Sequence, residues 1–430
     1  MNPTAGHLQY DHRDNDRRNN GRANDIGQIL RDTLTVILAG GQGTRLYPLT
    51  KHRAKPAVPF GGIYRIVDFT LSNAVNSGLR RILLLTQYKS LSLDRHLQSG
   101  WNILRGELGE FIMQLPPQQR LVRSWYEGTA DAIFQNIYSL EEQRPEYTLI
   151  LSGDHIYLMD YVPMIRSLVE NDADLVIAAI EVDREEAQRF GVMSVDETDR
   201  VVDFREKPDN PSTIPGRDTS LVSMGVYVFK TATLVHRVLE DAKNPASDHD
   251  FGKNVIPAMI KKDRVFAWQL RGRNDHAPYW RDIGTLDSYW EASMDLLSSD
   301  PPVDIYDPAW PIRTYQEQRP PSRIGTDADG NQPVIIDSIF AKGVRIAGAT
   351  IERSILSTDV VIESGAEVSE SVLMNRVRIG RGARVRRTLI DKSTSIPADE
   401  VIGFDTEADR RRFLVTENGI VVIPRDFVFA

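Results

Sequence analysis

The sequence predicts a two-part α/β protein, in which a Rossmann-like mixed-sheet domain is followed by a C-terminal parallel β-helix. Short apolar strand patterns alternate with helical patterns over roughly the first 300 residues, as is typical of a sheet with parallel strands. A glycine-rich turn ends the first buried strand of that region. Towards the C-terminus, aliphatic residues recur about every six positions, which is the period of a three-sided β-helix.

Composition narrows the functional class. The chain has 430 residues, of which 41% are apolar and 26% charged, as expected for a soluble globular protein with more than one domain. A net charge of -8 argues against nucleic acid as the main partner, and the sequence has no apolar run of about 18 residues that would span a membrane. The absence of cysteine excludes disulfides and cysteine nucleophiles and fits a reducing, cytoplasmic location.

The first predicted strand, residues 35–39, is apolar and rich in β-branched residues, as expected for a strand buried on both faces. Gly40, Gly41 and Gly43 follow it, and their backbone amides can form a concave site for an anion. Four basic residues come next: Arg45, Lys51, Arg53 and Lys55. Together these features predict a phosphate site, although the common G-x-x-x-x-G-K-[ST] pattern is absent. A surface loop with solvated charges is the alternative.

Two aspartates at the ends of predicted strands are candidate metal ligands. Asp154 follows the buried strand at residues 147–151, and Asp282 precedes a turn and a helix. One or two carboxylates together with substrate phosphates suit Mg²⁺, which prefers oxygen ligands. Each aspartate alone could equally cap the helix that follows it.

Two further segments are candidates for substrate binding. Glu206 and Lys207 follow a predicted strand and place an acid beside a base, which suits sugar hydroxyls and a phosphate, although a solvated ion pair would look the same. Gly128 and Asp131 lie in a turn that opens a helix, whose N-terminus can face an anion or a base or can be an ordinary cap. The histidines lack metal-hydrolase spacing, and no G-x-S-x-G elbow is present.

The composition changes twice along the chain. The first thirty residues are rich in Asn, Arg and Asp, and the stretch near residue 310 is rich in proline and has no period. In the last hundred residues, aliphatic positions such as Ile362, Val368 and Leu373 recur, although a meander of short strands is an alternative. We therefore expect a disordered tail over residues 1–32, an α/β domain over 33–300, a linker over 301–330 and a β-helix over 331–430.

Several motifs resemble those of the sugar-nucleotide pyrophosphorylases. LAGGQGTRL is shared across that superfamily, whereas RAKPAVPFGG, ILLLTQY, WYEGTADAI, SGDHIY, FREKP, DFGKNVIP and YWRDIGTLDSYW together are similar to the bacterial ADP-glucose pyrophosphorylase family. The resemblance extends from about residue 35 to the end of the chain. It implies a nucleotidyltransferase α/β domain followed by a left-handed parallel β-helix. It also implies that ATP and glucose 1-phosphate give ADP-glucose and pyrophosphate, the step that commits glucose to glycogen synthesis.

The resemblance assigns roles to individual residues. Arg45 and Lys55 are expected to stabilise the triphosphate and the developing charge, while Asp154 and Asp282 are expected to hold Mg²⁺. The expected ATP-binding residues are Gly40, Gly41, Gly43, Thr44, Gln87, Gly128 and Asp131. The expected glucose-1-phosphate-binding residues are Tyr126, Gly191, Glu206, Lys207 and Ser223. A sugar phosphate dianion needs no general base, so catalysis would consist of positioning and charge neutralisation.

The resemblance also implies regulation. Bacterial members are typically homotetramers, so we expect a tetramer with a sugar-phosphate or pyruvate activator and with AMP, ADP or phosphate as inhibitor. The expected effector-binding residues are His52, Arg53, Arg65, Arg386 and Arg412, with arginines solvated on a coil face as the alternative. His52 stands where members activated by fructose 1,6-bisphosphate have a lysine. Because a neutral imidazole binds phosphate less well, activation is expected to be weaker, pH-dependent or due to another effector.

Three other functions compete with this interpretation. An acetyltransferase with a related β-helix would use a histidine, and no histidine follows His276. A nucleotidyltransferase of the same fold with another nucleotide preference is opposed by RAKPAV and YWRDIGT. A non-catalytic regulatory subunit is opposed by the four charged residues expected at the active site, all of which are present: Arg45, Lys55, Asp154 and Asp282.

Overall fold

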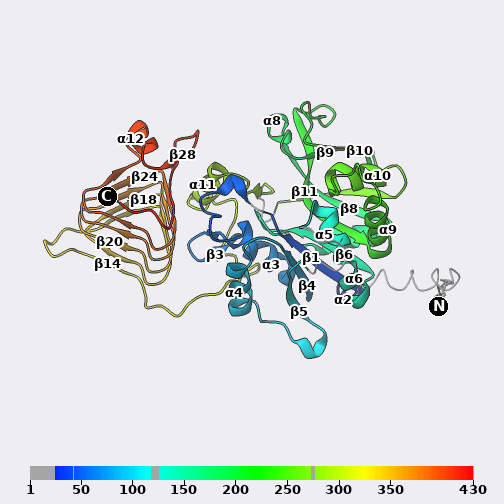
Figure 1. Ribbon diagram of the computed structural model, residues 1–430, viewed down its shortest axis with the longest axis horizontal. Coiled ribbons are helices and arrows are strands. Elements are labelled where there is room, and N and C mark those ends of the chain that lie inside the picture. Colours follow the sequence, from blue (N-terminus) through cyan, green and yellow to red (C-terminus); the bar gives the residue numbers. More distant parts are fainter. Residues whose placement is uncertain (1–24, 42, 118–124, 273–276, 430) are drawn as a thin grey trace.

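The computed structural model describes residues 25–41, 43–117, 125–272 and 277–429, which form two domains joined by an extended segment (Figure 1). An α/β domain and a β-helix lie at opposite ends of the long axis. Most of the predicted tail falls outside the described residues. Its last part differs from the prediction, because helix α2 (Ile26–Arg31) is capped by the side chain of Asp25 and buries Ile29 in the core.

A nine-stranded mixed sheet forms the centre of the α/β domain. Its strands run in the order β10-β9-β11-β6-β1-β4-β5, and β8 pairs with β11 and β12. Strands β6, β1, β4 and β5 are parallel, whereas β11 is antiparallel to β6 and β8, so the predicted mixed sheet is confirmed. The strands are β1 (Thr33–Ala39), β4 (Arg81–Thr86), β5 (Phe111–Leu115), β6 (Tyr147–Ser152), β8 (Leu175–Asp183), β9 (Gly191–Val195), β10 (Val201–Glu206), β11 (Thr219–Lys230) and β12 (Val265–Gln269).

Helices cover both faces of this sheet because successive side chains of a buried strand point to opposite sides. Ile37 of β1 packs in the cluster that contains α3, α4 and α7, whereas its neighbour Val36 packs with α5, α6, α9 and α10. Among the described residues, the helices are too short or too polar to cross a membrane. Their bounds are α3 (Ile66–Asn76), α4 (Leu91–Gly100), α5 (Thr129–Phe134), α6 (Ile137–Gln143), α7 (Val162–Glu170), α8 (Arg184–Ala187), α9 (Thr231–Asp241), α10 (Ile256–Met259), α11 (Leu286–Asp295) and, in the β-helix, α12 (Thr406–Arg410).

Shorter elements lie at the edges of the α/β domain. Two two-stranded ladders pair β2 with β3 and β7 with β13, both antiparallel. These strands and the short helical turns are β2 (Pro59–Phe60), β3 (Tyr64–Arg65), β7 (His155–Tyr157), β13 (Trp280–Asp282), η1 (Thr44–Leu46), η2 (Lys55–Ala57), η3 (Gly106–Leu108) and η4 (Phe251–Val255).

The C-terminal domain is a three-sided parallel β-helix, as predicted. On one side, Ile346, Ile362, Ile379 and Ile396 stack in register, and all four are buried. The first side is β14 (Arg323–Gly325), β17 (Arg345–Ala347), β20 (Val361–Ile362), β23 (Arg378–Ile379) and β26 (Ser395–Ile396). The second is β15 (Val334–Ile336), β18 (Thr350–Glu352), β21 (Glu367–Ser369), β24 (Arg384–Arg386) and β27 (Val401–Ile402). The third is β16 (Ile339–Phe340), β19 (Ile355–Leu356), β22 (Val372–Leu373), β25 (Thr388–Ile390) and β29 (Val421–Ile423), edged by the antiparallel β28 (Leu414–Val415).

The segment between the domains is fixed along the α/β domain. The indole of Trp310 donates a hydrogen bond to Asn73 of α3 over 2.9 Å, and the backbone N–H of Arg313 donates one to Ser72 over 2.8 Å. Strand β14 begins at Arg323, within the range predicted as linker. The two domains also share an apolar cluster that includes Phe60 from one and Leu389 from the other, so the β-helix is packed directly against the α/β domain.

Candidate active site

Three parallel strands end at one edge of the sheet and place the predicted residues there. Gly40 follows β1, Gln87 follows β4, and Asp154 lies two residues beyond β6. Ligands of open α/β sheets bind at the carboxyl ends of such strands. The loop after β6 is held at this edge, because the N–H of Gly153 donates to the carbonyl of Leu38 over 3.0 Å.

A short antiparallel ladder brings the two predicted metal ligands together. Strand β7 pairs with β13 so that His155 lies opposite Asp282. Asp154 immediately precedes His155, and ligand atoms of Asp154, His155 and Asp282 all lie within 4.8 Å of one another. Asp282 comes from a distant part of the sequence, and this strand pairing places its carboxylate beside that of Asp154.

Lys55 lies between these carboxylates. Its Nζ is 2.6 Å from Oδ2 of Asp154 and 3.0 Å from Oδ1 of Asp282. Burial opposes the charged form of Lys55, but the two carboxylates outweigh burial and raise the pKa of its ammonium. Burial also opposes ionisation of Asp154, yet the charge of Lys55 and hydrogen bonds from Lys55 and Ser152 hold the pKa of that carboxyl well below its usual range. Lys55 and Asp154 are therefore both charged at neutral pH.

One cavity borders this centre, and another lies at the carboxyl ends of β1 and β4. The glycine-turn cavity has a volume of about 310 Å³ and is lined by Leu38, Gly40, Gly41, Leu85, Gln87, Tyr88, Tyr126, Gly128, Thr129, Ala132 and Asp250. The Glu206 cavity has a volume of about 440 Å³ and is lined by Arg45, His155, Glu186, Arg189, Phe190, Gly191, Glu206, Lys207, Ser223, Met224, Gly225, Tyr227, Trp280, Arg281, Asp282, Gly284, Thr285, Ser288 and Glu291. Most of the residues predicted for ATP and for glucose 1-phosphate are thus separated into two different cavities.

Close packing explains two of the predicted glycines. A Cβ on Gly128 would lie 2.2 Å from the carbonyl oxygen of His249. A Cβ on Gly191 would lie 2.4 Å from the ring of Phe204 and 2.9 Å from the carboxylate of Glu206. A side chain at Gly128 would therefore displace the backbone of His249, and one at Gly191 would displace Phe204 and Glu206.

Glu206 and Lys207 are adjacent in the Glu206 cavity. Nζ of Lys207 is 3.2 Å from Oε1 of Glu206, and Lys207 has a φ of +45°, which is uncommon for a residue with a side chain. Ser223 lies nearby and donates a hydrogen bond to the hydroxyl of Tyr227 over 3.3 Å. The cavity thus presents the carboxylate of Glu206, a hydrogen-bond acceptor, beside the ammonium group of Lys207.

Some predicted residues lie elsewhere than expected. Tyr126, expected on the glucose 1-phosphate side, lines the glycine-turn cavity, whereas Arg45, expected at the triphosphate, lines the Glu206 cavity. Thr44 begins the turn η1 and lines neither of these cavities. Asp131 also lies outside both, because its carboxylate is buried and accepts hydrogen bonds from the backbone of Glu127 and the side chain of Gln135.

Among the cavity residues to which no role was assigned from the sequence are four with polar groups: His155, Tyr227, Asp250 and Trp280. Three of them lie inside motifs that carried the family resemblance, namely SGDHIY, DFGKNVIP and YWRDIGTLDSYW. A signal for these three was therefore present in the sequence. Tyr227 had no such signal, because it faces the cavity only through the pairing of β11.

Comparison with curated proteins places the chain in a family. A glucose-1-phosphate adenylyltransferase of Rhodopirellula baltica is 50% identical over 409 residues, which are 94% of this chain and 92% of that protein. The chain belongs to the glucose-1-phosphate adenylyltransferase family. A second relative of that name, from Methylococcus capsulatus, is 49% identical over 93% of this chain and 95% of its own length. The glucose-1-phosphate adenylyltransferase 2 of Vibrio cholerae is 49% identical over 93% of this chain and 100% of its own length.

Two family models match the two domains separately. The nucleotidyl transferase model matches residues 34–299, and the GlmU-like, C-terminal hexapeptide model matches residues 320–423. The glucose-1-phosphate adenylyltransferase family thus accounts for both halves of the chain. The hexapeptide repeat agrees with the six-residue aliphatic period and with the three-sided domain.

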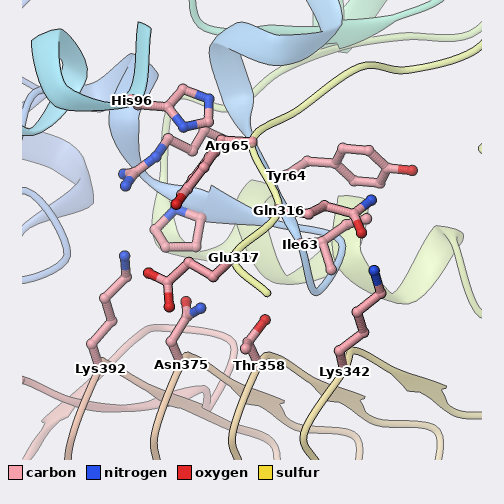
Figure 2. A pocket seen from close by; sticks show the side chains of 12 residues that line it. Ile63, Tyr64, Arg65, His96, Gln316, Glu317, Lys342, Thr358, Asn375 and Lys392 are labelled. Atoms are coloured by element: carbon pink, nitrogen blue, oxygen red, sulfur yellow. The ribbon is translucent and has the colours of Figure 1, made fainter. Parts of the chain in front are cut away.

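In this member of the glucose-1-phosphate adenylyltransferase family, a third cavity of about 90 Å³ lies between the domains. Figure 2 shows side chains from successive coils of the β-helix pointing toward Arg65 and His96 of the α/β domain, with Glu317 of the linker between them. The residues that line this interdomain cavity are Pro59, Ile63, Tyr64, Arg65, His96, Tyr315, Gln316, Glu317, Lys342, Thr358, Asn375 and Lys392. Burial and the charges of Arg65 and Arg53 lower the pKa of Lys392 to about 7.

Of the five predicted effector-binding residues, Arg65 is the one that lines the interdomain cavity. Arg53 is buried, and its guanidinium donates three hydrogen bonds of 2.9, 2.9 and 3.1 Å to the carboxylate of Asp391. His52 lies at the surface, where its Nε2 is 2.7 Å from Asp426. These two residues bridge the domains without facing the cavity.

The predicted arginines of the β-helix also lie outside the interdomain cavity. Arg386 is half-exposed, with its Nε 3.7 Å from Glu370, and Arg412 pairs with Glu400 over 2.7 Å. The β-helix cations in the cavity are instead Lys342 and Lys392. These lysines were not predicted from the sequence, because nothing local marks which side of a coil faces the other domain.

Proposed function

We propose that this protein transfers the adenylyl group of ATP to glucose 1-phosphate, giving ADP-glucose and pyrophosphate, the step that commits glucose to glycogen synthesis. The observation that supports this most directly is the pair of cavities at the edge of the sheet that carries Asp154, one of them lined by Asp282. The glycine-turn cavity offers backbone amides and apolar walls to a nucleotide, and the Glu206 cavity offers a carboxylate and cations to a sugar phosphate. The relatives named above support the same reaction.

The reaction needs no general base. A sugar phosphate has a second pKa of about 6, so its oxygen is ionised at neutral pH and attacks the α-phosphorus directly. The new bond joins that oxygen to the α-phosphorus, while the bond to the bridging oxygen breaks and pyrophosphate leaves. Lys207 binds the sugar phosphate and Glu206 accepts hydrogen bonds from sugar hydroxyls. Lys55 and Arg45 neutralise the charge that develops on the phosphates.

We also propose Mg²⁺ as the cofactor. Asp154 and Asp282 supply carboxylate oxygens close enough to share one ion, and the pKa of Asp154 is held low enough to keep it ionised. Such a donor set fits Mg²⁺, which takes one or two carboxylates together with substrate phosphates. When bound, the ion would neutralise phosphate charge during transfer.

A nucleotide panel tests the proposed reaction. Purified protein is incubated with glucose 1-phosphate, Mg²⁺ and ATP, UTP, dTTP or GTP in turn, and sugar nucleotide and pyrophosphate are quantified. We expect ADP-glucose from ATP at a rate well above that with any other nucleotide. A preference for another nucleotide would indicate a different transferase of the same fold, and no product with any would indicate a non-catalytic subunit.

We further propose that the interdomain cavity binds an anionic effector: a sugar phosphate or pyruvate as activator, and AMP, ADP or phosphate as inhibitor. Its support is the convergence of three basic side chains, Arg65, Lys342 and Lys392, from both domains. Glu317 shares the cavity, so an incoming anion has to outcompete this carboxylate. The test is a screen of these metabolites on the wild-type rate, repeated with Lys342→Gln. No response to any of them would disprove regulation through this cavity.

We propose a homotetramer located in the cytoplasm, where ATP is available, with neither nucleic acid nor membrane as a partner. The first coil of the β-helix leaves Ile324, Val334 and Ile336 between 44% and 49% exposed, an apolar strip that a second subunit can cover. Mass photometry tests the assembly, with a peak expected at four times the 48.6 kDa of the chain. A monomer peak at micromolar concentration would contradict it.

A further inference from the structure

His155 lies beside both candidate metal ligands, and its two ring nitrogens have different surroundings. Nδ1 lies 3.3 Å from the indole nitrogen of Trp280, which donates a hydrogen bond to it. Nε2 faces the carboxylates, 3.4 Å from Oδ1 of Asp154 and 3.9 Å from Oδ1 of Asp282. The two rings pack edge to face with centroids 5.0 Å apart, and both side chains are buried.

These contacts assign the imidazole proton. An indole N–H can only donate, so Nδ1 of His155 has to accept and carries no hydrogen. A neutral imidazole has one N–H, which is therefore on Nε2 and points toward Asp154 and Asp282. A nitrogen that bears hydrogen has no lone pair for a metal ion. In this arrangement His155 turns an N–H, and not a lone pair, toward the carboxylates.

Packing keeps Trp280 in place as the donor. Its ring lies edge to face against Phe190, with centroids 4.9 Å apart, and its backbone pairs with Tyr157 in the β7–β13 ladder. That same ladder carries His155 and Asp282. The pairing of β7 with β13 therefore fixes the relative positions of the indole of Trp280, the imidazole of His155 and the carboxylate of Asp282.

We infer that His155 is a positioning residue that orients the carboxylates of Asp154 and Asp282, and that Trp280 fixes its tautomer so that a divalent cation there has oxygen ligands only. This inference rests on the proposed function of the two aspartates as cation ligands. Oxygen-only sites suit Mg²⁺ and Mn²⁺, whereas an available imidazole nitrogen favours Zn²⁺ and Ni²⁺. Trp280 would thus determine metal preference without touching the metal.

The decisive variant is Trp280→Phe, which keeps an aromatic ring but removes the N–H donor. Nδ1 of His155 is then free to hold the proton, and Nε2 presents a lone pair to the cation site. Zn²⁺ affinity of the full chain, measured by competition with a chromophoric indicator, is expected to rise on the order of tenfold, the usual effect of an outer-shell partner. Mn²⁺ affinity, measured by electron paramagnetic resonance, is expected to change much less.

Trp310→Phe is the matched control. Trp310 and Trp280 are both 8% exposed, and the indole of each donates a hydrogen bond, that of Trp310 to Asn73. The control is expected to keep the wild-type ratio of Zn²⁺ to Mn²⁺ affinity. If Trp280→Phe gains no Zn²⁺ affinity, or if Trp310→Phe gains as much, the tautomer assignment is wrong.

Variants of His155 test its role independently. His155→Ala is expected to lower Mn²⁺ affinity on the order of tenfold, and His155→Gln, which retains an N–H donor, to recover most of that loss. Adding His155→Gln to Trp280→Phe is expected to remove the gain in Zn²⁺ affinity. If His155→Gln lowers the Zn²⁺ affinity of the wild-type chain, His155 is a metal ligand and the inference fails. All these measurements are made without substrate, so they remain interpretable whatever sugar nucleotide the protein makes.

Discussion

Arg53 and Lys55 lie two residues apart, and both are basic side chains buried against aspartates from distant parts of the chain. The partners of Lys55, Asp154 and Asp282, keep 25% and 27% of their side chains exposed. Arg53 and its partner Asp391 are 4% and 2% exposed. The open cluster can exchange contacts with a ligand, whereas the enclosed pair can only join the domains. Solvent access on one side therefore separates a charge cluster that a ligand can reach from one that it cannot.

The largest effect is expected from the open cluster. Asp154→Asn keeps the shape of the side chain but removes one charge from the site, so kcat is expected to fall on the order of 10²–10³, as when one preorganised charge-stabilising group is lost. Pyrophosphate release under saturating substrates measures this. Thermal unfolding is the control and is expected to stay near that of the wild type, because the side chain is partly solvated. Near-normal turnover would remove Asp154 from the mechanism.

The enclosed pair is expected to affect stability instead. Arg53→Met leaves the carboxylate of Asp391 buried without its guanidinium, which is expected to cost about 3–5 kcal/mol of unfolding free energy. Denaturant titration measures this loss. The double variant Arg53→Met/Asp391→Leu removes both charges and is expected to recover most of it. If the single variant is as stable as the wild type, the pair does not fasten the domains.

A smaller effect is expected at the interdomain cavity. The pKa of Lys392 is lowered to about 7, so its amine is charged below that pH and neutral above it. Binding of pyruvate, whose own charge is constant in this range, is expected to strengthen on the order of fivefold between about pH 8 and pH 6, as one amine gains its proton. Calorimetric titration at several pH values measures the affinity.

Lys392→Gln is the control for this pH dependence and is expected to flatten it. His96 lines the same cavity and keeps its own surroundings in that variant. A pH dependence that survives in Lys392→Gln would therefore have to be assigned to another group of the cavity.

The smallest effect is expected at the exposed contact between the domains. Hydrogen bonds from His52 and Lys51 lower the pKa of Asp426, whose partners are about half-exposed. These contacts thus stabilise the folded state above pH 3.8, the ordinary pKa of the carboxyl group. Their contribution is lost as the pH falls through the lower pKa that Asp426 has in the folded protein. Asp426→Asn is expected to shift the neutral-pH denaturation midpoint far less than Arg53→Met, because exposed ion pairs contribute little. Equal shifts would contradict the distinction by burial.

Much of the fold followed from local patterns. The apolar strands, the alternation with helices and the six-residue aliphatic period each depend on a few neighbouring residues, so they were readable in the sequence. The glycine turn and the two aspartates were also identified, and the structure brings Asp154 and Asp282 together, while their roles remain predictions. Tyr126 and Arg45 line different cavities from those expected. Their placement was not predictable, because it depends on where distant strands end.

By itself, the sequence determined the two-domain architecture and the identity of the residues at the edge of the sheet, because backbone conformation and burial pattern are encoded over short spans. Only the tertiary structure decided which charges meet. Lys55 and Arg53 are both basic and lie two positions apart, yet the pairing of β7 with β13 gives Lys55 a partly open site, and the packing of the β-helix encloses Arg53. Solvent access is a property of the assembled surfaces, so no local pattern could reveal it.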